Sequence, residues 1–501
     1  MNREPFHCHP SIILEKAGGF LVCCILILLS QANEILPLLL SGQLNANTWE
    51  TAVFCLFFMF GVPGLIGGYQ FLSWKKTWIS LEEHTLVIER NTLFRKKNTY
   101  SIPHIANINT EQNLFELLLH TCRIKIDLEN ATDANATDIS IVLSMKKARK
   151  LKTLLLALRQ GESPAETVEH LSDVDKEAES YASFSDILTH CICSLSGGIL
   201  VFALFVLVIG GLLLYGGKLS LEELLWEDKN ADFSMKILAV AFLVISYGSQ
   251  IIHKFLQFYH FTAIRKQETL IIRYGFFRRQ DYAIPIRNIQ AVRIIQAPAA
   301  RLLHFYEAQM ICVGIGDSKE ELTQLSLCCK KSVLYQRMGV LLPEFSTASM
   351  EKMHKPPKGV SKLYTCAFLG KIAVLLLIYG CLLAYVGKSA SQFTFGISSS
   401  VALIAVSLFL YHLLHARCQG FHLGKSMAVF SGGIMTKTVT FLPYQNIQRL
   451  CLKQGPLSAM LKMQHGSAYI LASLLSRETA VPYLSLEEMR KLKENMAKDK
   501  T

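Results

Sequence analysis

The sequence contains none of the short motifs by which catalytic sites are commonly found. It has no HExxH, no GxSxG and no P-loop, and such patterns bring together the metal ligands, nucleophiles or phosphate-binding amides that catalysis needs. We therefore expect a protein that is not an enzyme and that uses no cofactor. Charged residues are also scarce, at 18% of the chain against 51% hydrophobic residues, and the apolar residues are not spread evenly.

The cysteines are not arranged in pairs. The 14 cysteines show no regular spacing, and in a reducing compartment we expect them to be thiols that pack as small apolar side chains. His7-Cys8-His9 and Cys328-Cys329 have no second half at the spacing of a zinc site. We therefore expect neither a disulfide framework nor a metal site.

Aromatic residues are not interleaved with the basic ones. The chain has a formal net charge of +12, and a basic surface with stacking aromatic side chains is typical of proteins that bind nucleic acid. Here the positive charge is divided among three separate blocks that lack such stacking positions. We therefore expect no nucleic acid as a partner.

Long apolar windows are the dominant feature that is present. Six of them reach the length of about 20 residues that crosses a bilayer. They predict an integral membrane protein with six transmembrane α-helices in three hairpins, surrounded by the lipid bilayer. The first window is too long for a cleaved signal peptide, and no small-residue cleavage site follows it. The windows are 18–40, 51–74, 187–215, 235–258, 367–386 and 395–414.

The distribution of basic residues predicts the orientation in the membrane. Most of the 51 lysines and arginines fall outside the apolar windows, in the long polar blocks, whereas the short connection 41–50 has none. Because basic segments remain on the cytoplasmic side, we expect the polar blocks and both termini in the cytoplasm of a multi-pass plasma-membrane protein. A glycosylated domain on the opposite side is the alternative, since Asn130 and Asn135 stand in Asn-Ala-Thr sequons.

Two parts of the chain resemble each other over a long stretch without a gap. Pro285 aligns with Pro443, and Asn288-Ile289-Gln290 aligns with Asn446-Ile447-Gln448. A divergent third copy, 85–109, carries Ile-Pro at the equivalent place. Such similarity implies an internal repeat, and it predicts three units in which two apolar helices precede a polar block.

These units divide the chain into seven segments. The linker is rich in acidic residues, serine and proline, which favours disorder. The segments are the N-terminal part with the first hairpin, 1–74; the divergent first domain, 75–160; the acidic linker, 161–186; the second hairpin, 187–258; the second domain, 259–345; a linker with the third hairpin, 346–414; and the third domain, 415–497.

Each polar block has the pattern of a small α+β domain. Short runs rich in Val, Ile, Tyr and Phe alternate with turn residues, as in β-strands, and Gly275 and Gly433 stand at expected hairpin turns. An amphipathic helix closes each block and begins at a serine such as Ser332 or Ser485, where Ser485 and Glu488 form a capping box. We expect a bent sheet or partly open barrel capped by this C-terminal helix.

Two segments carry a likeness to a known family. They are IPIRNIQAVRIIQAPAARLLH, residues 284–304, and LPYQNIQRLCLKQGPLSAMLK, residues 442–462, which match that family's Ile-Pro, Ile-Gln and short Leu-rich turn. The chain thereby resembles the bacterial PH-like domain (bPH2) family of YdbT-type membrane proteins. The resemblance implies that pairs of transmembrane helices alternate with PH-like domains, and it brings no catalytic residues. It is strong in the second and third units and weak in the first.

These observations favour a non-catalytic, membrane-anchored interaction or assembly platform that displays PH-like domains in the cytoplasm. The expected partner is a membrane or cytoplasmic protein whose identity the sequence does not give. We expect it to contact a rim on the second and third domains. The residues of this rim are Pro285, Asn288, Gln290, Pro443, Asn446 and Gln448.

The alternative function is an anionic-lipid sensor or an accessory subunit of a membrane transporter. Arg278 and Arg279 lie in the first hairpin of the second domain, where the likeness to PH domains that bind phosphoinositides implies basic ligands. Each base beside an anionic leaflet contributes about 1 kcal/mol. Residues 435–437 do not repeat this pair. Transport would need broken spans at matching positions, and only the first hairpin has candidates, at Pro37 and 61–68.

Overall fold

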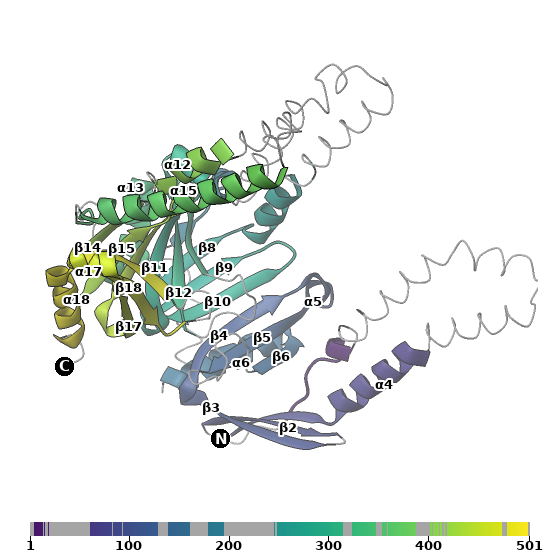
Figure 1. Ribbon diagram of the computed structural model, residues 1–501. Coiled ribbons are helices and arrows are strands. Elements are labelled where there is room, and N and C mark those ends of the chain that lie inside the picture. The colour runs from purple at the N-terminus through teal and green to yellow at the C-terminus, as the bar shows by residue number, and fades with distance from the viewer. Residues whose placement is uncertain are drawn as a thin grey trace, which may run out of the picture. The chain divides into compact units, whose positions relative to one another are not determined.

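Two compact units make up the computed structural model of the protein (Figure 1). One comprises 1–176 with 277–283, and the other comprises 177–276 with 284–501. Apart from short gaps, the residues described are 5–15, 61–128, 139–160, 179–194, 245–313, 323–346, 353–386, 401–472 and 478–498.

The same order of elements occurs three times along the chain. Each repeat has three strands, a 3-10 turn, a fourth strand, a short helix, two further strands and a final helix. The first repeat follows α4 (Val62–Lys75). It consists of β1 (Thr77–Glu82), β2 (Thr85–Asn91), β3 (Arg95–Ser101), η2 (Ile102–His104), β4 (Ile105–Gln112), α5 (Leu114–Leu118), β5 (Thr121–Leu128), β6 (Ile139–Ser144) and α6 (Met145–Gln160).

The second repeat is preceded by β7 (Glu179–Tyr181) and α8 (Phe184–Cys193), and the third by α15 (Gly359–Val386). The second consists of β8 (Thr262–Lys266), β9 (Thr269–Tyr274), β10 (Arg279–Pro285), η3 (Ile286–Asn288), β11 (Ile289–Gln296), α12 (Pro298–Leu302), β12 (Phe305–Cys312), β13 (Thr323–Lys330), α13 (Lys331–Leu341) and α14 (Pro343–Ser346). The third consists of β14 (Gly420–Leu423), β15 (Met427–Gly432), β16 (Lys437–Pro443), η5 (Tyr444–Asn446), β17 (Ile447–Lys453), α17 (Pro456–Met460), β18 (Met463–Ile470), β19 (Glu478–Ser485) and α18 (Leu486–Lys498).

Each repeat is built from antiparallel strands around one core. In the first, β1, β2 and β3 form one sheet, and β4, β5 and β6 lie side by side in another. Ile79 and Leu86 of the one share a core with Ile124 and Ile141 of the other, and Leu155 of α6 joins them. The expected sheet with a C-terminal helix is therefore present, because residues of both sheets and of the helix share one core.

Neighbouring repeats also share strand pairing. In the second unit β16 pairs antiparallel with β11, so that Val292 lies opposite Phe441. In the first unit residues 279–283 of β10 pair antiparallel with β4, and Arg279 lies opposite Gln112. The third strand of one repeat thus extends the sheet of the repeat before it. This pairing satisfies backbone groups that an edge strand would leave unpaired.

Several local predictions are confirmed and one is wrong. Gly275 and Gly433 have φ angles of 111° and 89°, the left-handed region that hairpin turns require. The amide of Ser485 donates to Glu488 Oε2 at 2.8 Å, and the amide of Glu488 donates to Ser485 Oγ at 3.2 Å, which is the expected capping box. Ser332 is not an N-cap, because α13 has already begun at Lys331.

The prediction of six transmembrane helices is wrong. Among the residues described, one helix is long and apolar enough to cross a membrane, Gly359–Cys381 within α15. By contrast α4 has 14 residues and α8 has 10, fewer than a bilayer needs. The apolar window that begins at 187 misled the prediction because Ile187, Cys191 and Cys193 of α8 are buried in the protein. All or part of the windows 18–40, 51–74, 187–215, 235–258 and 395–414 lies outside the described residues.

The candidate span is anchored in the third repeat. Val360 and Leu363 of its first turns pack against Met463 of β18, whereas Leu377, farther along, is exposed. A helix of 23 residues is about 35 Å long, which is enough for a hydrocarbon core of about 30 Å. The helix begins before the predicted window 367–386, because its first turns belong to the core of the third repeat.

Candidate functional site

The short helix between the fourth and fifth strands presents apolar side chains to solvent in every repeat. Its last residue is Leu118 in α5, Leu302 in α12 and Met460 in α17, and these residues are 76%, 81% and 81% exposed. Leu303 is also exposed, and we call Leu302 and Leu303 the apolar tip of the second repeat. Large apolar side chains exposed at one repeated position mark an interaction surface.

A basic residue with a positive φ angle follows each short helix. It is His120 at 53°, His304 at 60° and Lys462 at 52°. Residues other than glycine seldom adopt this conformation, so its recurrence at three equivalent places makes the turn part of the repeated fold. The turn places a basic side chain directly beside the exposed apolar residues.

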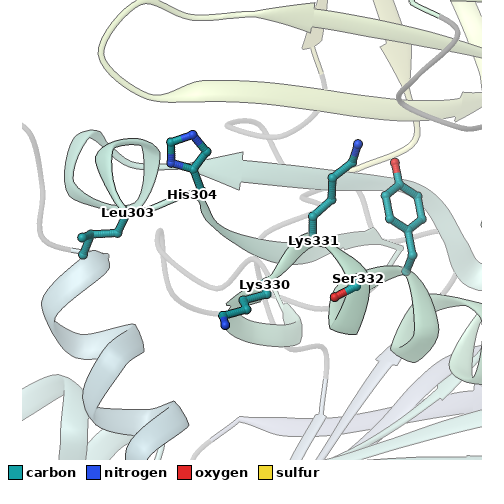
Figure 2. Close-up of a pocket in the computed structure, with 6 residues that line it drawn as sticks. Leu303, His304, Lys330, Lys331 and Ser332 are labelled. Atoms are coloured by element: carbon teal, nitrogen blue, oxygen red, sulfur yellow. The ribbon is translucent and has the colours of Figure 1, made fainter.

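In the second repeat this turn borders an open pocket of about 530 Å³, which we call the basic pocket (Figure 2). Lys331 Nζ lies 6.0 Å from the centre of the Tyr335 ring, and Figure 2 shows His304, Lys330, Lys331 and Ser332 around the pocket. None of the lining residues is acidic, so the pocket has a positive character. The lining residues are Leu303, His304, Lys330, Lys331, Ser332 and Tyr335.

The basic pocket lies at the N-terminus of α13. Lys330 occupies the N-cap position without a side-chain capping hydrogen bond, and the first turn holds no acidic residue. The first amides of a helix have no acceptor within the helix, and the helix dipole adds positive potential there. With two lysines beside those amides, the pocket is suited to bind a phosphate or another small anion.

The other two repeats differ at this position. In the first repeat α6 begins at Met145 followed by Lys146 and Lys147, again without an acidic residue in its first turn. In the third repeat α18 carries Glu487 and Glu488 in its first turn. The features that favour an anion therefore belong to the first and second repeats and are reversed in the third.

The short helices lie near segments that connect to helices before each repeat. Leu461, next to the exposed Met460, belongs to the cluster of Val360 and Leu363 in the first turns of α15. In the second repeat Ala300 of α12 packs with Cys193 at the end of α8. The exposed residues of α17 therefore lie beside the start of the candidate membrane span.

The structure gives several of the predicted partner residues internal contacts. Asn446 Nδ2 donates to the carbonyl oxygen of Gln290 at 2.8 Å, which ties the third repeat to β11. Partner contact at this rim stays a prediction. Of the six residues, Pro285 and Asn288 are buried, Gln290, Pro443 and Asn446 are half-buried, and Gln448 is exposed.

Arg278 is engaged within the first unit. Its Nε donates to Glu111 Oε1, and Lys125 Nζ lies 3.0 Å from the other oxygen of the same carboxylate. Burial by itself would raise the pKa of Glu111, but the hydrogen bond from Arg278 and the charge of Lys125 outweigh it and lower that pKa. Arg279 is exposed. Lipid contact by the two arginines stays a prediction.

A second polar cluster is buried in the second repeat. His190 of α8, Glu307 of β12 and Cys328 of β13 offer three potential ligand atoms that all lie within 4.8 Å of one another. Burial raises the pKa of Glu307 to about 7, against the opposing charge of Lys254, and lowers the pKa of His190 to about 3. The amide of Cys328 points at His190 Nδ1, so this nitrogen acts as an acceptor, as a metal ligand must. We call these three residues the buried triad.

Sequence reasoning missed both the apolar tip and the buried triad. The signal for the tip was present, because Leu302-Leu303-His304 aligns with Met460-Leu461-Lys462, an apolar pair followed by a base. In a sequence such an apolar pair is expected to belong to a core, and only the fold shows that Leu302, Leu303 and Met460 are exposed. The buried triad has no signal in the spacing, since its members come from distant parts of the chain.

Comparison with known proteins identifies the family. A family model described as the bacterial PH domain matches residues 24–159, 201–334 and 367–500. The chain belongs to the bacterial PH domain family. The three matches confirm the internal repeat and the predicted relationship, and each repeat is a PH-like domain. The exact domain boundaries stay predictions.

One curated relative extends this result. The transmembrane protein YdbT of Bacillus subtilis (strain 168) is 23% identical over 386 residues, which cover 73% of this chain and 74% of that protein. No solved structure matches the chain. Repeated PH-like domains and similarity to a transmembrane protein make this chain a membrane-associated PH-like protein.

Proposed function

We propose that the protein is a non-catalytic, membrane-anchored platform whose PH-like domains face the cytoplasm, and that its second domain binds the phosphate of an anionic lipid headgroup. The observation that carries this proposal is the basic pocket directly beside the apolar tip. A surface that combines exposed apolar side chains with lysines matches the two layers of a bilayer interface, acyl boundary and phosphate.

The apolar tip contributes more energy than the lysines. Burying one leucine side chain contributes about 1.5–3 kcal/mol, and each lysine near an anionic leaflet contributes about 1 kcal/mol. Leu302 and Leu303 with Lys330 and Lys331 therefore supply several kcal/mol to hold the second domain against a membrane that the chain already contacts. Neither part is strong enough alone to make docking permanent, which suits a domain that responds to lipid composition.

The third domain indicates which surface of the domains lies near the membrane. Its exposed Met460 lies next to Leu461, which packs on the start of the candidate span. A residue beside the emerging helix is near the bilayer surface. We assign headgroup binding to the second domain because the basic pocket lies there. In the third domain Glu487 and Glu488 disfavour an anion at the equivalent helix terminus, which leaves that domain to apolar contact or a protein partner.

The test uses the full-length protein in nanodiscs of neutral lipid and in nanodiscs that contain anionic lipid. Hydrogen exchange is followed at residues 298–304 and 330–335. We expect slower exchange in both peptides with anionic lipid, because docking covers the amides at the start of α13. Equal exchange of 330–335 in the two kinds of disc would contradict headgroup binding. If 298–304 is protected to the same extent in both kinds of disc, only apolar docking remains.

A further inference from the structure

The buried triad joins one helix to two strands. His190 lies in α8, Glu307 in β12 and Cys328 in β13, and all three are buried in the second domain. Buried polar groups cost free energy unless they are paired. A histidine, a carboxylate and a thiol gathered at one buried point therefore require a physical reason.

The contacts within the buried triad are long. The amide of Cys328 donates to His190 Nδ1 at 3.4 Å, and the same Nδ1 lies 3.4 Å from Glu307 Oε2. Cys328 Sγ lies 3.7 Å from that carboxylate oxygen. Good hydrogen bonds to nitrogen have a donor–acceptor distance of about 2.9 Å, so the bond from the Cys328 amide to His190 Nδ1 is weak, and an ion bound at Nδ1 would replace it. The other oxygen of Glu307, Oε1, accepts from Gln309 Nε2 at 3.2 Å, which leaves Oε2 as the oxygen that faces the triad.

We propose that His190, Glu307 and Cys328 bind a single divalent cation of the zinc type. A tetrahedral ion with Zn–S of about 2.3 Å and Zn–N or Zn–O of about 2.0 Å separates neighbouring ligand atoms by about 3.3–3.5 Å. The N···O and S···O separations of 3.4 and 3.7 Å are close to these values. Nitrogen, oxygen and sulfur together are a ligand set that zinc accepts.

A fourth ligand stands nearby. Cys193 follows His190 by three residues on α8, which places both on one face of the helix, and it packs in one cluster with Cys328. Its sulfur is not among the ligand atoms that lie within 4.8 Å of one another, so its side chain would have to turn toward the triad to complete four-coordination. Such closed sites with four protein ligands are structural rather than catalytic, in agreement with a non-catalytic protein.

The charges around the site balance with the ion bound. Two thiolates and one carboxylate around a divalent cation leave one net negative charge. Lys254, whose Nζ donates to the carbonyl oxygen of Ser194 at 2.6 Å, interacts electrostatically with Glu307 and offsets that charge. The ion would fix α8, which precedes the second domain, to the sheet of that domain.

The test begins with the purified full-length protein. After passage over a chelating resin its metal content is measured, and we expect about one zinc per chain. The protein is then loaded with Co²⁺. A thiolate-to-cobalt charge-transfer band with the visible bands of tetrahedral cobalt is expected, and a merely structural hydrogen-bond cluster would not give it. Absence of both retained metal and this band from the folded protein would overturn the proposal.

Variants locate the site. Cys328→Ser and Glu307→Gln keep the size of each side chain, and we expect a clearly weaker charge-transfer band in the first, because one of two thiolates is lost, and weakened metal retention in the second. Cys312→Ser, at another buried cysteine of the same domain, is the matched control and should keep both signals. Unchanged metal content and spectrum in Cys328→Ser would place any ion elsewhere and refute the site. If a variant does not fold, the metal content and cobalt spectrum of the unmodified protein still decide whether it binds the ion.

Discussion

Replacement of Lys330 and Lys331 by alanine tests the basic pocket most directly. Each lysine near an anionic leaflet contributes about 1 kcal/mol, so the double variant loses about 2 kcal/mol. Because 1.4 kcal/mol corresponds to a factor of ten, we expect the ratio of docked to undocked second domain to fall by about 30-fold. The apolar tip remains in this variant, so residual docking should no longer depend on lipid charge.

The assay is hydrogen exchange at residues 330–335 in nanodiscs with and without anionic lipid. The matched control is Lys491→Ala with Lys493→Ala, which removes the same charge from exposed positions on α18. The control should retain protection. Raising the ionic strength should reproduce the effect of the double variant, since the Debye length shortens from about 8 Å at 0.15 M to about 3 Å at 1 M. Equal loss of protection in variant and control would refute the pocket as the site and leave only a general effect of net charge.

Two further substitutions test the packing of the repeats. Arg278→Ala should destabilise the protein by about 1 kcal/mol at neutral pH, since it removes a hydrogen bond to buried Glu111. The pKa of Glu111 is lowered from 4.5, so this stabilisation is present above that value and is lost as the pH falls through the folded-state pKa. Thermal unfolding should show the difference from Arg279→Ala shrinking in acid, and a constant difference would contradict the ion pair. Gly433→Ala should destabilise by about 2 kcal/mol or more, because its φ is 89° and an added Cβ would lie 2.0 Å from the carbonyl oxygen of Thr436. Gly432→Ala, where nothing lies within 4 Å, is the control in denaturant unfolding, and equal losses would show that the turn is not constrained.

The sequence predicted much of each domain because local chemistry acts over short distances. The two glycines identified the turns because only a residue without Cβ adopts a positive φ without strain. Ser485 and Glu488 identified the start of the last helix, since a capping box needs only residues three apart. The aligned Pro285 and Pro443 revealed the repeat because two copies of one fold need the same residues at the same local positions.

The prediction of six transmembrane helices failed because it used the composition of each apolar window and not what surrounds that window in the fold. An apolar window has the same composition whether it faces lipid or protein, and in α8 Ile187 and Cys191 face protein. Leu302 shows the opposite case, since a leucine at the end of a short helix is expected to pack in a core, and this one is exposed to solvent. Burial depends on which elements pack together, and the hydropathy of a segment does not predict its packing partners.

By itself the sequence determined the threefold repeat, the strands followed by a terminal helix in each domain, and the relationship to a family. Tertiary structure alone decided where side chains from distant segments meet. His190, Glu307 and Cys328 come together because a helix before the domain packs on its sheet, and Lys330 meets His304 because β12 and β13 are paired. Local patterns fix the backbone over a few residues, whereas a site depends on the packing of whole elements, which is set by the sum of many weak contacts.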